Sequence, residues 1–159
     1  KISLTESGRD HAVNIVRRHR LWETFLYQKL DFSWDEVHEV AEQLEHIQSQ
    51  KLVDKLEEYL EFPAFDPHGD PIPNANGEIV PTVKEVLANL KAGDIAFVAS
   101  IRDTSNVFLQ YLEKLGINIG TTIQVMEKVD FDGSMTIIID EQEPRSVSVK
   151  FAQSLYVRK

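Results

Sequence analysis

The chain has 159 residues, 42% of them apolar and 27% charged, which suits one mid-sized folded domain or two small ones and excludes a disordered protein. Its net charge of −9 argues against a nucleic-acid-binding surface on these residues, because phosphate contacts are made largely by clustered Lys and Arg side chains. Since the sequence has no cysteine, thiolate ligands and disulfides are excluded, and any metal ion must be held by carboxylate, imidazole, carbonyl or water.

The first part of the chain, residues 1–62, has the apolar spacing of helices. The apolar stub at residues 1–4 is interpreted as the end of a strand. A first helix is predicted to begin within residues 5–8 and to run to about Leu30. The one basic cluster surrounds His19 and is interpreted as a solvated helix face: Arg17, Arg18 and Arg20.

Two shorter helices are predicted to follow. The second starts at Ser33, where Ser33 and Glu36 have the spacing of a capping box, and is expected to run through His46. Ser49 announces the third helix, whose apolar positions have helical spacing: Leu52, Val53, Leu56, Tyr59 and Leu60. This stripe exceeds what the other two helices can cover, and it therefore predicts a homodimer.

The remainder of the chain changes its pattern twice. Residues 63–80 hold four of the six prolines and two of the seven glycines, so an ordered loop or linker is predicted there. Beyond it, a helix is predicted at Asn106–Leu115, ended by Gly116, together with a tight hairpin turn at Asp132 and Gly133. Strands are predicted at residues 94–101, 122–129, 134–140 and 146–149. Short strands at this spacing, with one helix, indicate a small barrel of roughly 70 residues.

The main candidate for chemistry lies between residues 37 and 47. Two carboxylates and an imidazole stand three and four residues apart, so a helix projects them toward one side, where they can chelate one divalent ion: Glu42, Glu45 and His46. His38, one turn earlier, is interpreted as an orienting or core residue. On the first helix, His19 and Glu23 form a second pair at helical spacing that can face these ligands across an antiparallel helix contact.

Two further candidate ligands lie in the proline-rich loop, where Pro67 restricts the backbone between Asp66 and His68. Glu and His on a helix are usually a solvated face. Metal binding is the favoured hypothesis here because four of the five histidines accompany the carboxylates in three neighbouring segments. His11 is interpreted as a surface residue, and Asp70 is interpreted equally well as a turn residue.

The candidate ligands fit a protein that senses a metal ion, but two other classes of protein stay open at this point. A carboxylate-bridged metalloenzyme usually repeats a Glu-x-x-His pair on two helices, but Gln43 precedes His46 and Val16 precedes His19 at that spacing. The third class is a metal-independent interaction module, in which the barrel binds protein ligands. Metal titration separates the three, since a sensor binds without turnover, an enzyme turns over and an interaction module ignores metal.

Three runs of sequence, LTESGRDHAVNIVRRHRLWE, VHEVAEQLEH and FPAFDPHGDPIP, closely resemble the diphtheria toxin repressor and manganese transport regulator family of metal-dependent repressors. The resemblance implies an α + β fold, with a helical dimerisation and metal-binding domain at residues 1–62 and a proline-rich linker at 63–84. An SH3-like, FeoA-type small β-barrel is implied at residues 85–159. In that family a winged-helix DNA-binding domain comes first, and residues 1–4 match the last strand of its wing.

The resemblance also sorts the ligands. It implies a primary site at Glu42, Glu45 and His46, and the glutamate at position 42 is typical of manganese-type members. It further implies a secondary site at Glu23, Asp66, His68 and Asp103, with His19 beside both sites. The expected metal is Mn²⁺, for which Fe²⁺, Zn²⁺, Co²⁺ or Cd²⁺ can substitute in vitro.

The implied function is that of a repressor, not an enzyme, which turns off metal-uptake genes when manganese is plentiful. It would act as a homodimer and would contact operator DNA only through the N-terminal domain. Because no stretch approaches about 18 uncharged apolar residues and the start lacks a signal-peptide pattern, no membrane association and a cytoplasmic location are expected.

Overall fold

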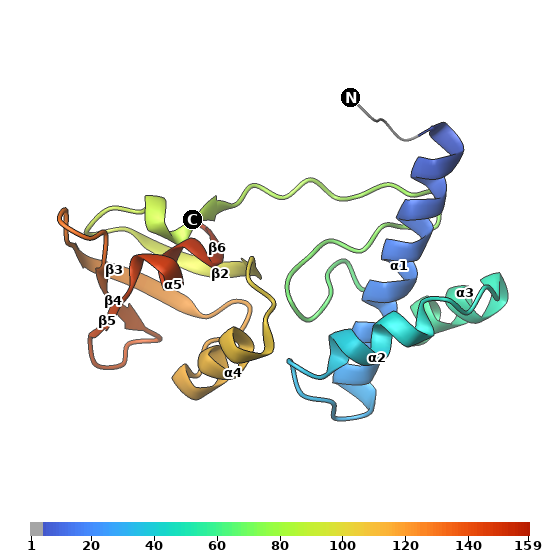
Figure 1. Cartoon of the computed structure of the whole chain (residues 1–159), viewed down its shortest axis with the longest axis horizontal. Coiled ribbons are helices and arrows are strands. Elements are labelled where there is room, and N and C mark those ends of the chain that lie inside the picture. The colour runs from blue at the N-terminus through green and yellow to red at the C-terminus, as the bar shows by residue number, and fades with distance from the viewer. Residues whose placement is uncertain (1–4) are drawn as a thin grey trace. The chain divides into compact units, whose positions relative to one another are not determined.

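The computed structural model describes residues 5–159 and divides the chain into two compact units, Lys1–Thr82 and Val83–Lys159. The first unit is built from helices and a long loop, and the second from an antiparallel sheet with short helices (Figure 1). The strand predicted at residues 1–4 lies outside the described residues. Within the described residues, no helix combines the length and the apolar character that crossing a membrane requires.

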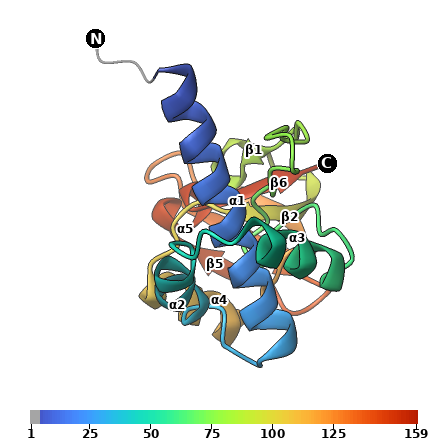
Figure 2. The same ribbon diagram turned by 90° about the vertical axis from the view of Figure 1, so that its right-hand side faces the viewer.

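The first helix, α1 (Glu6–Lys29), confirms the prediction made for it. Thr5 caps its N-terminus, because the side-chain oxygen accepts a hydrogen bond from the amide of Gly8 at 3.1 Å. The helix ends where Asp31 takes a positive φ of 56°. Both shorter helices of this unit contact α1 (Figure 2). It is therefore the element against which the candidate ligands of the other segments are placed.

The second helix, α2 (Val37–Leu44), is shorter than predicted. Half of the expected capping box is present, since the Ser33 amide donates to Glu36 Oε2 at 2.9 Å. The predicted extension through His46 is wrong. After Leu44 the hydrogen bonds tighten, with the Ile47 amide donating to the Leu44 carbonyl, so the chain leaves the helix in a turn.

The third helix, α3 (Gln50–Tyr59), is capped by Ser49, the residue predicted to announce it. Its predicted stripe divides into two parts. Leu52 and Tyr59 are exposed. The remaining members join the buried apolar residues of α1 and α2 in one core: Leu21, Trp22, Leu26, Val37, Ala41, Val53, Leu56, Leu60 and Ile72.

The basic cluster on α1 is not a solvated face, and that interpretation was wrong. Arg17 is 2% exposed, and its Nη2 donates to Glu57 Oε2 at 2.6 Å. Arg18 Nε donates to the backbone carbonyl of Glu45 at 2.7 Å, and Arg20 donates to a carbonyl of the proline-rich loop. The three side chains point to different neighbours because successive helical residues are about 100° apart around the axis.

Residues 63–80 form a loop without a helix, as predicted, and contain one isolated bridge between Phe65 and Pro71. The loop folds back on itself, because the Asp66 amide donates to the Asp70 carbonyl and the Ile72 amide donates to the Ala64 carbonyl, each at 2.9 Å. The ends of this short segment are thereby held close together.

The second unit is a six-stranded antiparallel sheet with the order β1-β6-β2-β3-β4-β5. Its elements are β1 (Glu85–Val86), η1 (Leu87–Asn89), β2 (Ile95–Ile101), α4 (Asn106–Leu115), β3 (Thr122–Lys128), β4 (Met135–Ile139), β5 (Arg145–Val147), α5 (Val149–Gln153) and β6 (Leu155–Arg158). The four predicted strands and the predicted helix are all present, and Gly116 ends α4 with a φ of 72°.

Two strands and two short helical segments escaped prediction. β6 is only four residues long, yet it lies between β1 and β2, where Val157 pairs with Val98. A strand of this length has no readable period of its own. The hairpin turn predicted at Asp132 and Gly133 is present between β3 and β4, but it is longer than predicted, because it closes with the Val129 amide donating to the Ser134 carbonyl.

Candidate metal centre

Glu23, on α1, is the carboxylate around which the candidate ligands of the first unit gather. Its side chain is 3% exposed, and Oε1 lies 3.0 Å from His19 Nε2 and 3.1 Å from His38 Nδ1. Its other oxygen, Oε2, lies 3.7 Å from His68 Nδ1. His19 is one turn earlier on α1, His38 is on α2, and His68 belongs to the loop. Helix contact and loop docking thus bring three imidazoles to one buried carboxylate.

Asp66 joins this cluster from the loop. It is buried, and its Oδ1 accepts hydrogen bonds from the amides of His68 and Asp70, each at 2.9 Å. Its other oxygen lies 3.6 Å from Arg20 Nε on α1. Glu23, Asp66 and His68 each offer a ligand atom within 4.8 Å of the others, as do His19, Glu23 and His38. Among the described residues these are the two groups of three that could hold an ion.

The far nitrogen of each imidazole faces a hydrogen-bond acceptor. His19 Nδ1 lies 2.6 Å from Glu45 Oε2, and His68 Nε2 lies 3.1 Å from the backbone oxygen of Trp34. His38 Nε2 lies 3.5 Å from Glu42 Oε1. A neutral imidazole donates one proton, so an acceptor at the far nitrogen leaves the lone pair on the near nitrogen. Metal-bound histidines have this arrangement, in which an outer acceptor fixes the tautomer.

The ionisable groups of the cluster respond to one another. Burial raises the pKa of Glu23, but hydrogen bonds and positive charge from His19 and His68 outweigh it and hold that pKa well below its usual range. Burial lowers the pKa of His19. The hydrogen bonds and negative charges of Glu23 and Glu45 raise it by more, so the pKa of His19 is raised overall. The pKa of His68 is raised in the same way, mainly by Glu23.

The pKa of Asp66 is shifted in the opposite direction to the pKa of Glu23. Burial, and then the negative charge of Glu23, raise its pKa to about 7, although the backbone hydrogen bond from Asp70 acts to lower it. Two carboxylates in one buried cluster cannot both be ionised at low cost without added positive charge. A divalent cation would supply that charge, so the donor set fits a metal ion.

The structure places the predicted primary-site residues differently from the prediction. Glu42 is exposed on α2, whereas Glu45 and His46 lie beyond the last helical residue, so the three side chains do not project from one helix. Within residues 5–159, neither three-residue ligand group includes any of them. Instead, Glu45 contacts His19 and Glu42 contacts His38. The primary site itself stays a prediction.

His38 is a candidate ligand that the sequence analysis interpreted instead as an orienting or core residue. The signal was present, since His38 and Glu42 have helical spacing, as do His19 and Glu23. What the spacing could not show is that α2 packs on α1 with His38 directed at Glu23, with the His19 and His38 ring centroids 4.8 Å apart. His11 is exposed, as predicted.

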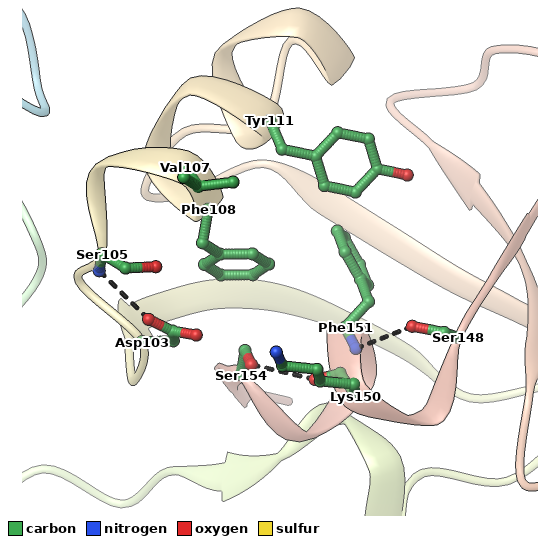
Figure 3. A pocket seen from close by; sticks show the side chains of 9 residues that line it. All are labelled: Asp103, Ser105, Val107, Phe108, Tyr111, Ser148, Lys150, Phe151 and Ser154. Carbon is green, nitrogen blue, oxygen red and sulfur yellow. Dashed lines mark hydrogen bonds between the residues drawn. The ribbon is translucent and has the colours of Figure 1, made fainter.

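Asp103 lies in the second unit. Its Oδ1 accepts a hydrogen bond from the Ser105 amide at 3.0 Å, just before α4, and contacts with Ser105 lower its pKa. It borders a pocket of about 300 Å³ whose apolar wall contains Phe108, Tyr111 and Phe151 (Figure 3). The ligand role expected for Asp103 stays a prediction.

Two protein families match consecutive parts of the chain. Residues 5–74 match the family described as iron dependent repressor, metal binding and dimerisation domain. Residues 86–159 match the FeoA domain. The matches confirm the predicted α + β class, in which a helical part is followed by an SH3-like, FeoA-type domain.

Individual known proteins are also similar to this chain. A solved structure described as a manganese-dependent transcriptional repressor in complex with manganese is 39% identical, with a TM-score of 0.89 over 98% of this chain and 73% of that one. The iron-dependent repressor IdeR of Mycobacterium tuberculosis is 39% identical over 72 residues, which are 45% of this chain and 31% of that protein.

A probable metal transport system membrane protein of Chlamydia trachomatis serovar D is 45% identical over 71 residues, which are 45% of this chain and 16% of that protein. The chain thus spans less than a third of each of these two curated relatives.

Proposed function

The chain belongs to the iron-dependent repressor family of metal-dependent transcriptional repressors, and on that basis we propose that it forms the metal-sensing and dimerising part of a manganese-responsive repressor. The observation that carries the proposal is the buried Glu23 carboxylate with three imidazoles directed at it. The proteins of this family are repressors, which are not enzymes.

Manganese is proposed because of the donors. The cluster offers carboxylate and imidazole but no thiolate, since the sequence has no cysteine. Mn²⁺ binds weakly in the Irving–Williams order, so a manganese site must select by geometry and hard donors. The 39% identical structure described as a repressor in complex with manganese supports the same choice. Fe²⁺, Zn²⁺, Co²⁺ and Cd²⁺ are expected to occupy the same donors in vitro.

Two sites are proposed in the first unit. Glu23, Asp66 and His68 would hold the secondary-site ion with ligand atoms that already converge, and the bound ion would supply the positive charge that this buried cluster needs. The primary-site ion would use Glu42, Glu45 and His46. These three side chains stand at the end of α2, where the last two lie in a turn and could reorient without unfolding a helix.

The proposed mechanism is a population shift. An ion held by Glu23 of α1 and by Asp66 and His68 of the loop must favour the arrangement in which these segments lie together. It can shift the equilibrium only by its differential affinity for that arrangement. In the whole repressor, the favoured arrangement would set the distance between two DNA-reading heads. With a net charge of −9, this chain is not expected to form those heads itself.

A homodimer is proposed on the family's description as a dimerisation domain and on the exposed apolar side chains near the ends of α1 and α3. Leu30, Leu52, Tyr59 and Phe62 are all exposed in one protomer, and Lys29 on α1 lies over the Tyr59 ring. Apolar surface of this kind near two helix ends is typical of an interface between two copies.

The test is a calorimetric titration of the metal-free chain with Mn²⁺. Binding without turnover is expected, and Glu23→Gln should abolish binding at the cluster, since the amide keeps the size of the side chain but loses its charge. His11→Ala removes an exposed histidine from the same helix and should leave the titration unchanged. A chain that binds no Mn²⁺, or a Glu23→Gln variant that binds like the parent, would refute the proposed function.

A further inference from the structure

We propose that the second unit binds a free amino acid with a large apolar side chain, in the pocket between α4 and α5. The side chain would lie against the aromatic wall of the pocket. The carboxylate of the ligand would face Lys150, and its ammonium group would face Asp103. Such a ligand is not a metal ion, so this site goes beyond the metal-sensing function proposed above.

The aromatic wall of the pocket is held in place by the core of the second unit. Phe151 of α5 is 4% exposed, and its ring makes edge contacts with Phe108 and Tyr111 of α4, with ring centroids 5.7 Å and 5.8 Å apart. Phe108 and Tyr111 are three residues apart on α4, so they share a face of that helix. The three rings lie on one side of the pocket (Figure 3). A wall that is already ordered reduces the entropy that a ligand loses on binding.

Part of the apolar lining is open to solvent. Val107 is 80% exposed and Tyr111 is 44% exposed, and they lie four residues apart on α4. Covering such apolar surface with an apolar group is favourable. The pocket has a volume of about 300 Å³, which is at the lower end of the range for small-molecule sites. These dimensions suit one large apolar side chain of a small ligand.

The polar end of the pocket carries both signs of charge. Lys150 of α5 and Asp103, which comes just before α4, lie together at the end away from Tyr111 (Figure 3). Contacts with Ser105, and then the positive charge of Lys150, lower the pKa of Asp103, so this carboxylate is ionised near neutral pH. A zwitterion matches the pair, because its carboxylate accepts from the Lys150 ammonium and its own ammonium donates to Asp103. A simple acid or a simple amine would match only one of the two charges.

A second, polar hollow adjoins this end of the pocket. Asp103 and Lys150 line it as well, together with Arg102, Thr104 and Gln153 among others. A peptide could continue into this hollow, whereas a free amino acid would end at Asp103 and Lys150. Free and blocked ligands therefore distinguish an amino-acid site from a peptide site.

The test is a calorimetric titration of the 159-residue chain with L-phenylalanine and with L-leucine at millimolar concentration. A chelator is present throughout, so that metal ions take no part. We expect one amino acid per chain. N-acetyl-L-phenylalanine lacks the ammonium group and phenethylamine lacks the carboxylate, so each should bind roughly 10-fold more weakly than L-phenylalanine. In nuclear magnetic resonance spectra, the amides of α4 and α5 should shift on addition of L-phenylalanine.

Variants at exposed positions separate binding from folding. Lys150→Met and Tyr111→Ala should each lower the affinity for L-phenylalanine by roughly 10-fold. Their matched controls, Lys114→Met on the last turn of α4 and Phe131→Ala on the β3–β4 connection, should leave it unchanged.

Three results would overturn the amino-acid site. The chain could bind neither amino acid, Lys150→Met could bind like the parent, or N-acetyl-L-phenylalanine amide, which is blocked at both ends, could bind as tightly as L-phenylalanine. The last result would indicate a site for peptides instead. None of the three changes the expected binding of Mn²⁺, so the proposed metal sensor is tested separately.

Discussion

The Trp34 indole lies flat against the His68 imidazole, with ring centroids 5.9 Å apart and 9° between the ring planes. Trp34 Nε1 also donates to the Pro67 carbonyl at 2.8 Å, and His68 Nε2 lies 3.1 Å from the Trp34 backbone oxygen. These contacts fix the orientation of His68 and dock the proline-rich loop beside the start of α2.

Trp34→Leu should therefore loosen the loop and weaken the metal site that depends on His68. We expect faster proteolysis within residues 63–80 in the metal-free variant and an affinity for Mn²⁺ at this site lower by roughly 10-fold or more. Protease mapping and calorimetry measure the two effects. Trp22→Phe is the matched control, because Trp22 Nε1 has no hydrogen-bond partner to lose within residues 5–159. Unchanged proteolysis and affinity in Trp34→Leu would show that the stacking does not position His68.

The buried ion pair between Arg17 and Glu57 should matter more for folding than for metal binding. Arg17→Ala leaves the Glu57 carboxylate, whose side chain is 13% exposed, without its cation, and we expect the free energy of unfolding to fall by about 3 kcal/mol. Arg9→Ala, at an exposed position of the same helix, should change it by less than about 0.5 kcal/mol. Urea unfolding measures both, and equal effects would show that Arg17 contributes no more than a surface arginine.

The metal-free chain should lose stability as the pH rises from about 6 to about 8. A pKa raised in the folded state adds stability that is complete below the unfolded-state value and lost as the pH passes the folded-state value. Asp66, from 3.8 to about 7, has this sign, as do His19 and His68, each raised from 6.5. Glu23 has the opposite sign, so its contribution is lost only in acid.

Asp66→Asn should reduce that loss, because the amide oxygen can still accept from the amides of His68 and Asp70 but cannot ionise. With a chelator present, the stability advantage of the variant over the parent should be larger at about pH 8 than at about pH 6 by roughly 1 kcal/mol. Thermal unfolding at the two pH values measures the difference. Asp10→Asn, at an exposed position, is the control. A parent equally stable at both values would contradict the prediction.

The exposed aromatic residues at the end of α3 should hold the homodimer together. Tyr59→Asp and Phe62→Asp place a charge on side chains that are 61% and 68% exposed in one protomer, so neither change disturbs the core of the unit. Both should give a monomer mass by light scattering at micromolar concentration, where the parent is expected to give the mass of a dimer. Phe131→Asp, on the β3–β4 connection of the second unit, should leave the dimer intact. A parent that is monomeric would refute the dimer.

Local chemistry made the helix ends and the principal strands predictable. The caps at Thr5 and Ser49 and the stop at Gly116 depend on residues within a turn of one another, and α4 was predicted with its observed bounds. Periodicity failed where elements are too short to have a period, as in β6, and at the end of α2, where the turn after Leu44 takes His46 out of the helix.

The ligand types followed from the sequence, but their grouping did not. Carboxylates and imidazoles without cysteine already indicated a hard divalent ion, and helical spacing already paired His19 with Glu23. Only the packing of α2 and of the loop on α1 brought His38 and His68 to opposite oxygens of Glu23. Spacing along one helix determines which side chains share a face, whereas contact between segments depends on how apolar residues such as Leu21 and Val37 pack in the core.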